Sequence, residues 1–140
     1  MNRKIPDPIK YAREVVGRDP LASHLGIEVE EVREGYARCS IIVKQEHMNA
    51  VGRAHGALLY AMADQAFAVA SNSTGVMAIA VSFSINYVAS AMAGERVTSE
   101  ATPVNIGRKV SVWNISVLGP DERLIASGQG VAYHRDFPES

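Results

Sequence analysis

The sequence predicts an α+β domain in which a curved antiparallel β-sheet wraps around one long, buried α-helix. A helix candidate over residues 54–70 is apolar on almost every side, so other elements must enclose it. Two extended runs precede this segment and four follow it, with turn residues between them. The 140 residues contain no internal repeat, which favours a single domain over 1–140 with residues 1–20 as an N-terminal helical extension.

The extension is expected to contain one short amphipathic helix over residues 8–16. Pro8 opens this segment and Gly17 closes it, which are the positions these residues prefer at helix ends. Asp19 and Pro20 then predict a break in the chain. We expect this short helix to form a peripheral lid.

Residues 26–44 are predicted to form a β-hairpin around the turn Glu34-Gly35. In its second strand apolar and polar residues alternate, so one face is buried. The apolar positions are Ala37, Cys39, Ile41 and Val43. Residues 45–53 have no periodicity and predict a connecting loop, a kind of segment that often carries function.

The predicted central helix ends at the breaker cluster 72–75, and a strand follows over 81–87 with strict alternation. Three further strands are expected, separated by Gly- and Pro-containing turns. They cover about 95–104, 108–118 and 123–134. These strands predict an antiparallel meander.

The composition excludes several classes of protein. Fourteen Lys and Arg against 15 Asp and Glu give a net charge of −1, so no basic field exists to bind nucleic acid or an anionic membrane. The longest apolar runs, 57–63 and 76–81, are too short to span a bilayer. The single cysteine, Cys39, and the absence of a metal-ligand spacing predict no disulfide and no metal. With no signal peptide at the N-terminus, we expect a cytoplasmic protein.

The central helix carries a stripe of small residues with one carboxylate in its middle. At 100° per residue these positions fall on one face: Ala57, Ala61, Asp64 and Ala68. Burying an unpaired charge costs several kcal/mol, so Asp64 either faces a water-filled cleft or accepts several hydrogen bonds. The alternatives are a hydrogen-bonded structural aspartate and one at an exposed helix edge.

His55 and Gly56 stand at the start of the same helix. Free backbone N–H groups and the positive end of the helix dipole could stabilise an oxyanion there, and a glycine lets a substrate approach the backbone closely. Alternatively, Gly56 only permits a tight entry into the helix, and His55 is an ordinary first-turn residue.

Gly56 and Asp64 are eight positions apart, or about 12 Å along a helix. One chain therefore cannot bring both groups to the same carbonyl. If both act on one substrate, Gly56 of one protomer must face Asp64 of another, which a two-fold dimer with adjacent helices allows.

Two stretches, 49–57 and 63–73, resemble the hotdog-fold acyl-CoA thioesterases, most closely the PaaI-like branch of phenylacetic acid degradation. The similarity extends to Asn86-Tyr87, Gly94-Glu95 and Gly107-Arg108-Lys109. It implies a hotdog fold and homodimers that often pair into homotetramers. The family usually has a second glycine where Ala57 stands, so the methyl group of Ala57 is expected to narrow the entrance to the acyl pocket.

The resemblance, together with the residue chemistry, assigns roles to six residues. The Gly56 N–H would polarise the thioester carbonyl, and Asp64 would act as general base or as nucleophile. Asn49 would orient the water or the thioester, or else hold the loop. His55 would support the loop or donate a hydrogen bond near the thioester. Arg108 and Lys109 would bind the phosphates of coenzyme A, or else merely begin a solvated strand.

The expected activity is therefore hydrolysis of an aryl-acetyl-CoA, such as phenylacetyl-CoA, or of a medium-chain acyl-CoA, without a cofactor. One alternative is a non-catalytic acyl-CoA-binding or sensing protein of the same fold. Another, an acyl-thioester dehydratase or hydratase, needs a histidine and acid pair that the sequence lacks. Several aromatic residues could border an aryl pocket or lie in the core. They are Tyr11, Tyr36, Tyr60, Phe67 and Phe83. Surface or structural roles suit His24, His47 and His134.

Overall fold

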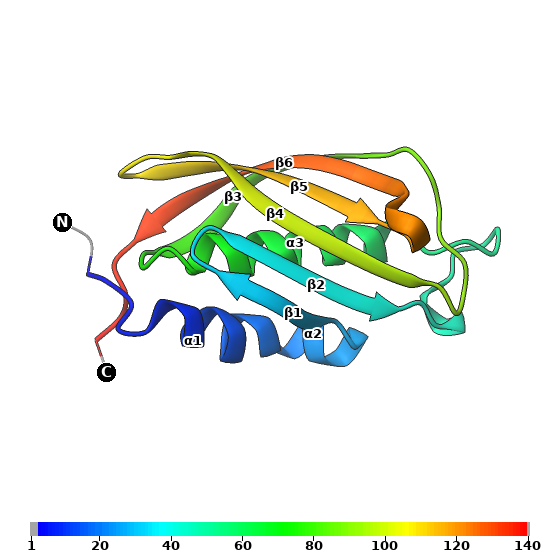
Figure 1. Ribbon diagram of the computed structural model, residues 1–140, viewed down its shortest axis with the longest axis horizontal. Coiled ribbons are helices and arrows are strands. Elements are labelled where there is room, and N and C mark those ends of the chain that lie inside the picture. Colours follow the sequence, from blue (N-terminus) through cyan, green and yellow to red (C-terminus); the bar gives the residue numbers. More distant parts are fainter. Residues whose placement is uncertain (1–2, 140) are drawn as a thin grey trace.

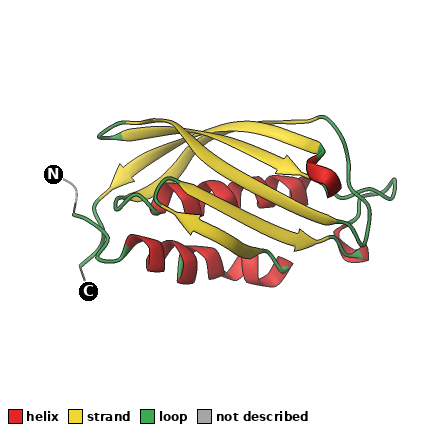
Figure 2. Ribbon diagram, in the orientation of Figure 1, coloured by secondary structure: helices red, strands yellow, loops and turns green. Residues whose placement is uncertain are grey.

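A computed structural model describes residues 3–139 and contains one six-stranded antiparallel sheet curved over a central helix (Figures 1 and 2). The helix is α3, Gly56–Asn72. The strands are β1 (Glu28–Arg33), β2 (Tyr36–Ile42), β3 (Met77–Tyr87), β4 (Arg96–Ile106), β5 (Val110–Leu118) and β6 (Leu124–Arg135). Their order across the sheet is β1-β2-β4-β5-β6-β3. The predicted hairpin, central helix and meander are confirmed.

The N-terminal segment differs from the prediction, because Asp19 and Pro20 begin a helix instead of marking only a break. The segment contains α1 (Pro8–Glu14), a short 3-10 turn η1 (Val16–Arg18) and α2 (Pro20–Leu25). The Asp19 carboxylate accepts a hydrogen bond from the Ala22 N–H at 3.0 Å, and Pro20 occupies the first turn. The helical segment therefore extends beyond residue 20, to Leu25.

These N-terminal helices belong to the core and do not form a peripheral lid. Ala12 of α1 is completely buried, and α1 packs against α3 and β1. The Gln65 side-chain amide of α3 donates a 2.8 Å hydrogen bond to the Val16 carbonyl. Figure 1 shows these helices, in blue, beside β1. They cover a flank of α3 that the sheet leaves open.

The end of α3 is joined to the start of β3 through one side chain. The Asn72 amide donates to the Ala68 and Ala78 carbonyls at 2.9 and 3.1 Å, and its oxygen accepts the Ala78 N–H at 3.0 Å. Strand β3 begins at Met77, earlier than predicted, because its first residues are continuously apolar and a bulge between Ala80 and Ser82 interrupts the alternation.

Strand β6 is unusually close to α3 at Gly130. A methyl group at this position would lie 2.4 Å from the Phe67 ring, so only glycine lets the ring pack directly on the strand. Phe67, Met62 and Trp113 are among the largest fully buried side chains. The core therefore lies between α3 and the concave face of the sheet.

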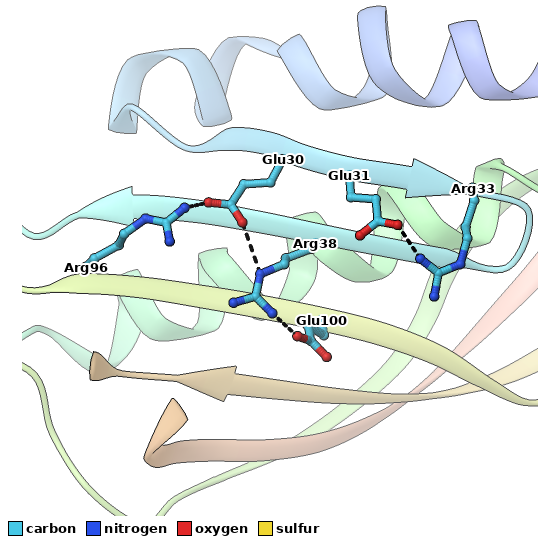
Figure 3. Close-up of polar contacts among 6 residues, drawn as sticks. All are labelled: Glu30, Glu31, Arg33, Arg38, Arg96 and Glu100. Atoms are coloured by element: carbon cyan, nitrogen blue, oxygen red, sulfur yellow. Dashed lines mark hydrogen bonds and ion pairs between the residues drawn. The ribbon is translucent and has the colours of Figure 1, made fainter. Parts of the chain in front are cut away.

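The two edges of the sheet differ in charge. Near β1, ion pairs cross the convex face, with Arg38 of β2 between Glu30 and Glu100 (Figure 3). Further pairs join Arg96 to Glu30 and Arg33 to Glu31. At the opposite edge, β3 contains no charged residue in its 11 positions. Ile79 and Val81 there are 41% and 62% exposed. The β3 edge is therefore uncharged and unpaired within residues 3–139.

Between Arg3 and Glu139, no helix is both long and apolar enough to cross a membrane.

Candidate active site

The start of α3 presents an open hydrogen-bond donor. His55 is the N-cap, and its Nδ1 accepts the Ala57 N–H at 2.9 Å. The His55 carbonyl accepts the N–H groups of Leu58 and Leu59. The Gly56 N–H has no partner within residues 3–139. A donor at the positive end of a 17-residue helix is therefore available to an oxygen that gains negative charge.

Because His55 Nδ1 accepts a hydrogen bond, its Nε2 carries the ring proton in the neutral state and can donate. The structure thus gives His55 a definite supporting role, as a cap of the helix that presents Gly56. A hydrogen bond from His55 to substrate stays a prediction.

An aromatic wall stands beside Gly56. A methyl group built on Gly56 would lie 3.6 Å from the Tyr87 ring, so the tyrosine packs against the glycine backbone. Burial, and to a smaller extent nearby Tyr60, raises the pKa of Tyr87. The Tyr60 and Phe83 rings meet edge to face with centroids 5.1 Å apart, and Phe83 also contacts Phe67. The wall therefore consists of residues from α3 and β3, and Phe67 lies behind it in the core.

Asn49 closes the loop that leads to His55. Its side-chain oxygen accepts the N–H groups of Val51 and Arg53 at 3.1 and 3.0 Å, and its own N–H donates to the Arg53 carbonyl at 2.7 Å. The side-chain oxygen of Asn49 therefore holds the loop, as one of the two predicted roles requires. Within residues 3–139 the side-chain nitrogen of Asn49 has no hydrogen-bond partner. Of the two polar atoms of this side chain, it is the nitrogen that is available to orient a ligand.

Two substitutions separate these roles of Asn49. Asn49→Asp keeps the acceptor oxygens, so we expect the thermal midpoint to stay near the native value while turnover falls about tenfold or more, because the donor is lost. Asn49→Ala also removes the acceptor, and should lower the free energy of unfolding by about 1–3 kcal/mol. Equal turnover of Asn49→Asp and the native protein would leave Asn49 with the loop role alone.

Asp64 lies in the predicted stripe, which the rest of the chain covers only in part. Ala61, Asp64 and Ala68 are half-buried and Ala57 is exposed. Asp64 makes no hydrogen bond or ion pair within residues 3–139, which argues against a hydrogen-bonded structural aspartate. Burial raises the pKa of Asp64, and the nearby Asp19 carboxylate raises it further. Such a carboxyl group is suited to accept a proton.

A pocket of about 330 Å³ lies beside the first two turns of α3, where it is bordered by Ala57 and Ala61 of the stripe. It is bordered by the cap residue His55 and by the first two turns of the helix, so it starts where Gly56 presents its N–H. The lining residues are Leu21, Leu25, Glu46, His47, Met48, His55, Ala57, Leu58 and Ala61. The side chains from α2 and α3 that line it are apolar.

Arg108 and Lys109 lie at the other end of the molecule. They occupy the turn between β4 and β5, and Arg108 borders a pocket with Thr74 and Val76, which follow the end of α3. A 17-residue helix, about 25 Å long, therefore separates this turn from Gly56 of the same chain. In Figure 1 the turn is the yellow end of the sheet, opposite the loop before α3. The structure does not bring these two cations to Gly56 within one chain.

The single thiol of the chain is buried and is not suited to act as a nucleophile. Burial raises the pKa of the Cys39 thiol to about 12, so the thiol is protonated and unreactive at neutral pH. Within residues 3–139 no group of three or more His, Cys, Asp or Glu side chains could hold a metal ion.

Leu21, Leu25 and Asp19 were not predicted from the sequence as neighbours of the site. The pattern of aspartate followed by proline is a helix start signal, and it could have revealed α2. The packing of Tyr87 against Gly56 had no local signal, because it joins residues 31 positions apart.

Comparison with known proteins gives a consistent result. The sequence profile described as "Thioesterase superfamily" matches residues 51–126. An Archaeoglobus fulgidus protein named "Putative esterase" is 40% identical over 122 residues, covering 86% of this chain and 79% of that protein. The acyl-coenzyme A thioesterase PaaI of Escherichia coli K12 is 30% identical over 115 residues, covering 82% of both chains.

The fold agrees with these matches. The structure of E. coli PaaI, from the phenylacetic acid degradation operon, superposes with a TM-score of 0.87 at 27% identity, covering 91% of this chain and 93% of that one. The predicted hotdog fold, with its curved sheet around α3, is thereby confirmed.

Proposed function

The chain belongs to the thioesterase superfamily and is a thioester hydrolase, and on this basis we propose that it hydrolyses acyl-CoA to a free acid and coenzyme A at a site shared between two protomers. The observation that carries this proposal is that one helix holds two groups without a hydrogen-bond partner. They are the Gly56 N–H and the half-buried Asp64 carboxyl group. Neither group is satisfied within residues 3–139, and each suits one part of thioester hydrolysis.

In the proposed mechanism the thioester oxygen lies at the Gly56 N–H of one protomer. Asp64 of the facing protomer takes a proton from water, and the resulting hydroxide oxygen attacks the carbonyl carbon. The tetrahedral oxyanion is held by the helix N-terminus, where removal of such a donor typically costs about 3–4 kcal/mol. Cleavage of the C–S bond then releases the acid and the coenzyme A thiolate, which takes up a proton.

The dimer is supported by the edge strand β3. A long, exposed edge strand without a charged residue is a surface that proteins rarely leave uncovered, and a second β3 strand would satisfy its free backbone groups. Tyr87 at one end of β3 packs against Gly56, while Met77 at the other end pairs with Arg135 of β6. Antiparallel pairing about a two-fold axis would set the Met77 end of the partner beside Gly56.

This pairing would also explain the remote position of Arg108 and Lys109. Their turn contacts β6 next to Arg135, so the partner's turn would approach the Gly56 end of this chain. We therefore assign Arg108 and Lys109 to the coenzyme A phosphates of the partner's site. Pairing of such dimers into a homotetramer remains part of the proposal.

Replacing Arg108 and Lys109 together with alanine should raise the KM for acyl-CoA about tenfold or more, because two charge-assisted contacts to phosphate are lost. The KM for an acyl thioester of N-acetylcysteamine, which lacks the nucleotide, should stay near the native value. Steady-state kinetics with both substrates checks this. A similar increase for both substrates would remove these cations from the coenzyme A site.

The acyl group is proposed to be aryl-acetyl or medium-chain. The apolar pocket beside His55 and the aromatic wall of Tyr60, Phe83 and Tyr87 support this range, since both adjoin Gly56. The direct experiment is a panel of acyl-CoAs with release of the free thiol as the readout. Phenylacetyl-CoA and hexanoyl- to decanoyl-CoA should be turned over fastest. Tight binding without thiol release across the panel would indicate an acyl-CoA-binding protein instead.

A further inference from the structure

Three buried side chains form a hydrogen-bonded chain beneath the turn that joins β4 to β5. The Trp113 Nε1–H donates to Ser111 Oγ at 2.8 Å, and Ser111 Oγ lies 2.9 Å from His134 Nε2. His134 Nδ1 lies 3.1 Å from the Arg108 carbonyl. Trp113 and Ser111 are completely buried, and His134 is 5% exposed.

The Arg108 carbonyl fixes the position of one proton in this network. A carbonyl oxygen only accepts, so Nδ1 of His134 carries a proton and donates to Arg108. Nε2 bonds to the Ser111 hydroxyl group, whose oxygen also accepts from Trp113. Every polar side-chain group of Trp113, Ser111 and His134 has a hydrogen-bond partner, which is the condition for a buried polar network to stabilise one conformation.

This network ends on the backbone of Arg108 and Lys109. The His134 N–H donates to the Lys109 carbonyl at 2.8 Å, so one residue binds two successive carbonyls of the turn. The Gly107 N–H closes the turn on the Val110 carbonyl at 2.8 Å, where a Cβ at residue 107 would also lie 2.8 Å away. Both cationic side chains remain exposed. The turn therefore has a backbone fixed from inside and two cations directed to solvent.

We infer that His134 is a positioning residue for coenzyme A binding, which holds Arg108 and Lys109 through the buried Trp113, Ser111 and His134 network. This inference rests on the proposed role of the two cations. A fixed backbone reduces the conformational freedom that the turn must lose when it binds the phosphates, so it raises affinity without a contact to the ligand. His134 itself does not touch substrate.

Two single substitutions of similar character test the inference. In His134→Asn the amide nitrogen lies near the position of Nδ1 and can still donate to the Arg108 carbonyl. In His134→Gln the amide reaches the position of Nε2 and meets Ser111 instead. We expect His134→Gln to raise the KM for acyl-CoA about fivefold to tenfold, which is the effect of releasing one or two side chains before binding.

His134→Asn should remain within about twofold of the native KM, since the bond to the turn persists. Both variants should keep the native kcat/KM for the N-acetylcysteamine thioester, which has no phosphate for the turn to bind. Calorimetric titration with coenzyme A alone gives the same comparison without turnover. The thermal midpoint of each variant shows that both chains fold.

Results that contradict the positioning role of His134 can be told apart from results that contradict the coenzyme A site. Equal KM values for His134→Asn and His134→Gln would overturn the inference while leaving the coenzyme A site in place. Parallel losses on both substrates would reduce His134 to a structural residue, and would also overturn it. If the Arg108 and Lys109 double variant binds coenzyme A with native affinity, the proposed phosphate site itself fails, and the positioning role fails with it.

Discussion

Asp64→Asn is expected to reduce kcat by at least about a hundredfold, because general-base catalysis typically contributes two to four orders of magnitude. The amide has nearly the same shape as the carboxyl group but cannot take a proton from water. Binding of acyl-CoA should persist, since Asp64 is not assigned to coenzyme A. Initial rates of thiol release and calorimetric titration measure the two effects separately. Native turnover in Asp64→Asn would contradict the mechanism.

The same substitution should make the protein more stable at neutral pH. The folded state raises the pKa of Asp64 through burial and through Asp19, so folding favours the protonated form. The stability that folding gains from protonated Asp64 is fully present below the pKa of this residue in the unfolded chain. It is lost as the pH rises through the pKa of Asp64 in the folded protein. At pH 7 the ionised side chain therefore costs stability, and asparagine avoids that cost. The thermal midpoint of Asp64→Asn should exceed the native value at pH 7, and the difference should shrink at acidic pH.

Labelled water distinguishes the two chemical roles of Asp64. In a single turnover in H₂¹⁸O, a general base delivers labelled oxygen to the product acid. A nucleophilic carboxylate forms an anhydride whose hydrolysis at the Asp64 carbonyl leaves the label in the protein. We propose the general base and therefore expect label in the acid. Mass spectrometry of the acid and of the peptide that contains Asp64 reads both outcomes.

Lysine at both Ile79 and Val81 is expected to yield a monomer with little remaining activity. These side chains lie on the uncharged edge strand β3 and are 41% and 62% exposed. In the proposed dimer the substitutions place four like charges near one interface, and each such contact costs up to several kcal/mol. Because Gly56 and Asp64 would then no longer face each other, kcat/KM should fall by about a hundredfold or more.

A matched variant carries two lysines at Val15 and Val104, which are 57% and 53% exposed and lie outside β3. It should keep the native assembly and the native rate. Sedimentation velocity, combined with rates over a range of protein concentrations, compares the two variants. A fully active monomer with lysines at 79 and 81 would refute the shared site, whatever the result for the control.

Much of the fold was predictable because its signals are local. Alternation of apolar and polar residues identified the second strand of the hairpin, and the turn compositions identified the meander from β4 to β6. The apolar character of α3 required an enclosing sheet, which the structure confirms. The stripe around Asp64 was also readable, because helical periodicity alone determines which residues share a face.

The remaining features depend on contacts between distant residues. Residues 76–80 carry no alternation, so the early start of β3 depends on its pairing with β6. The approach of Tyr87 to Gly56 and the burial of His134 under the β4–β5 turn result from the register of the sheet. The roles of Asn49, Asp64, Arg108 and Lys109 stay predictions, since they concern a ligand and a facing protomer.

The unequal edges of the sheet also govern how far association can proceed. A strand can be added beside β3, whereas the charged surroundings of β1 oppose a second junction there. In the proposed dimer, growth by edge pairing would stop when two sheets have joined, because each chain offers one uncharged edge and that edge is covered in the contact. The same difference between the two edges that supports the proposed dimer would thus protect the protein against polymerising into fibres.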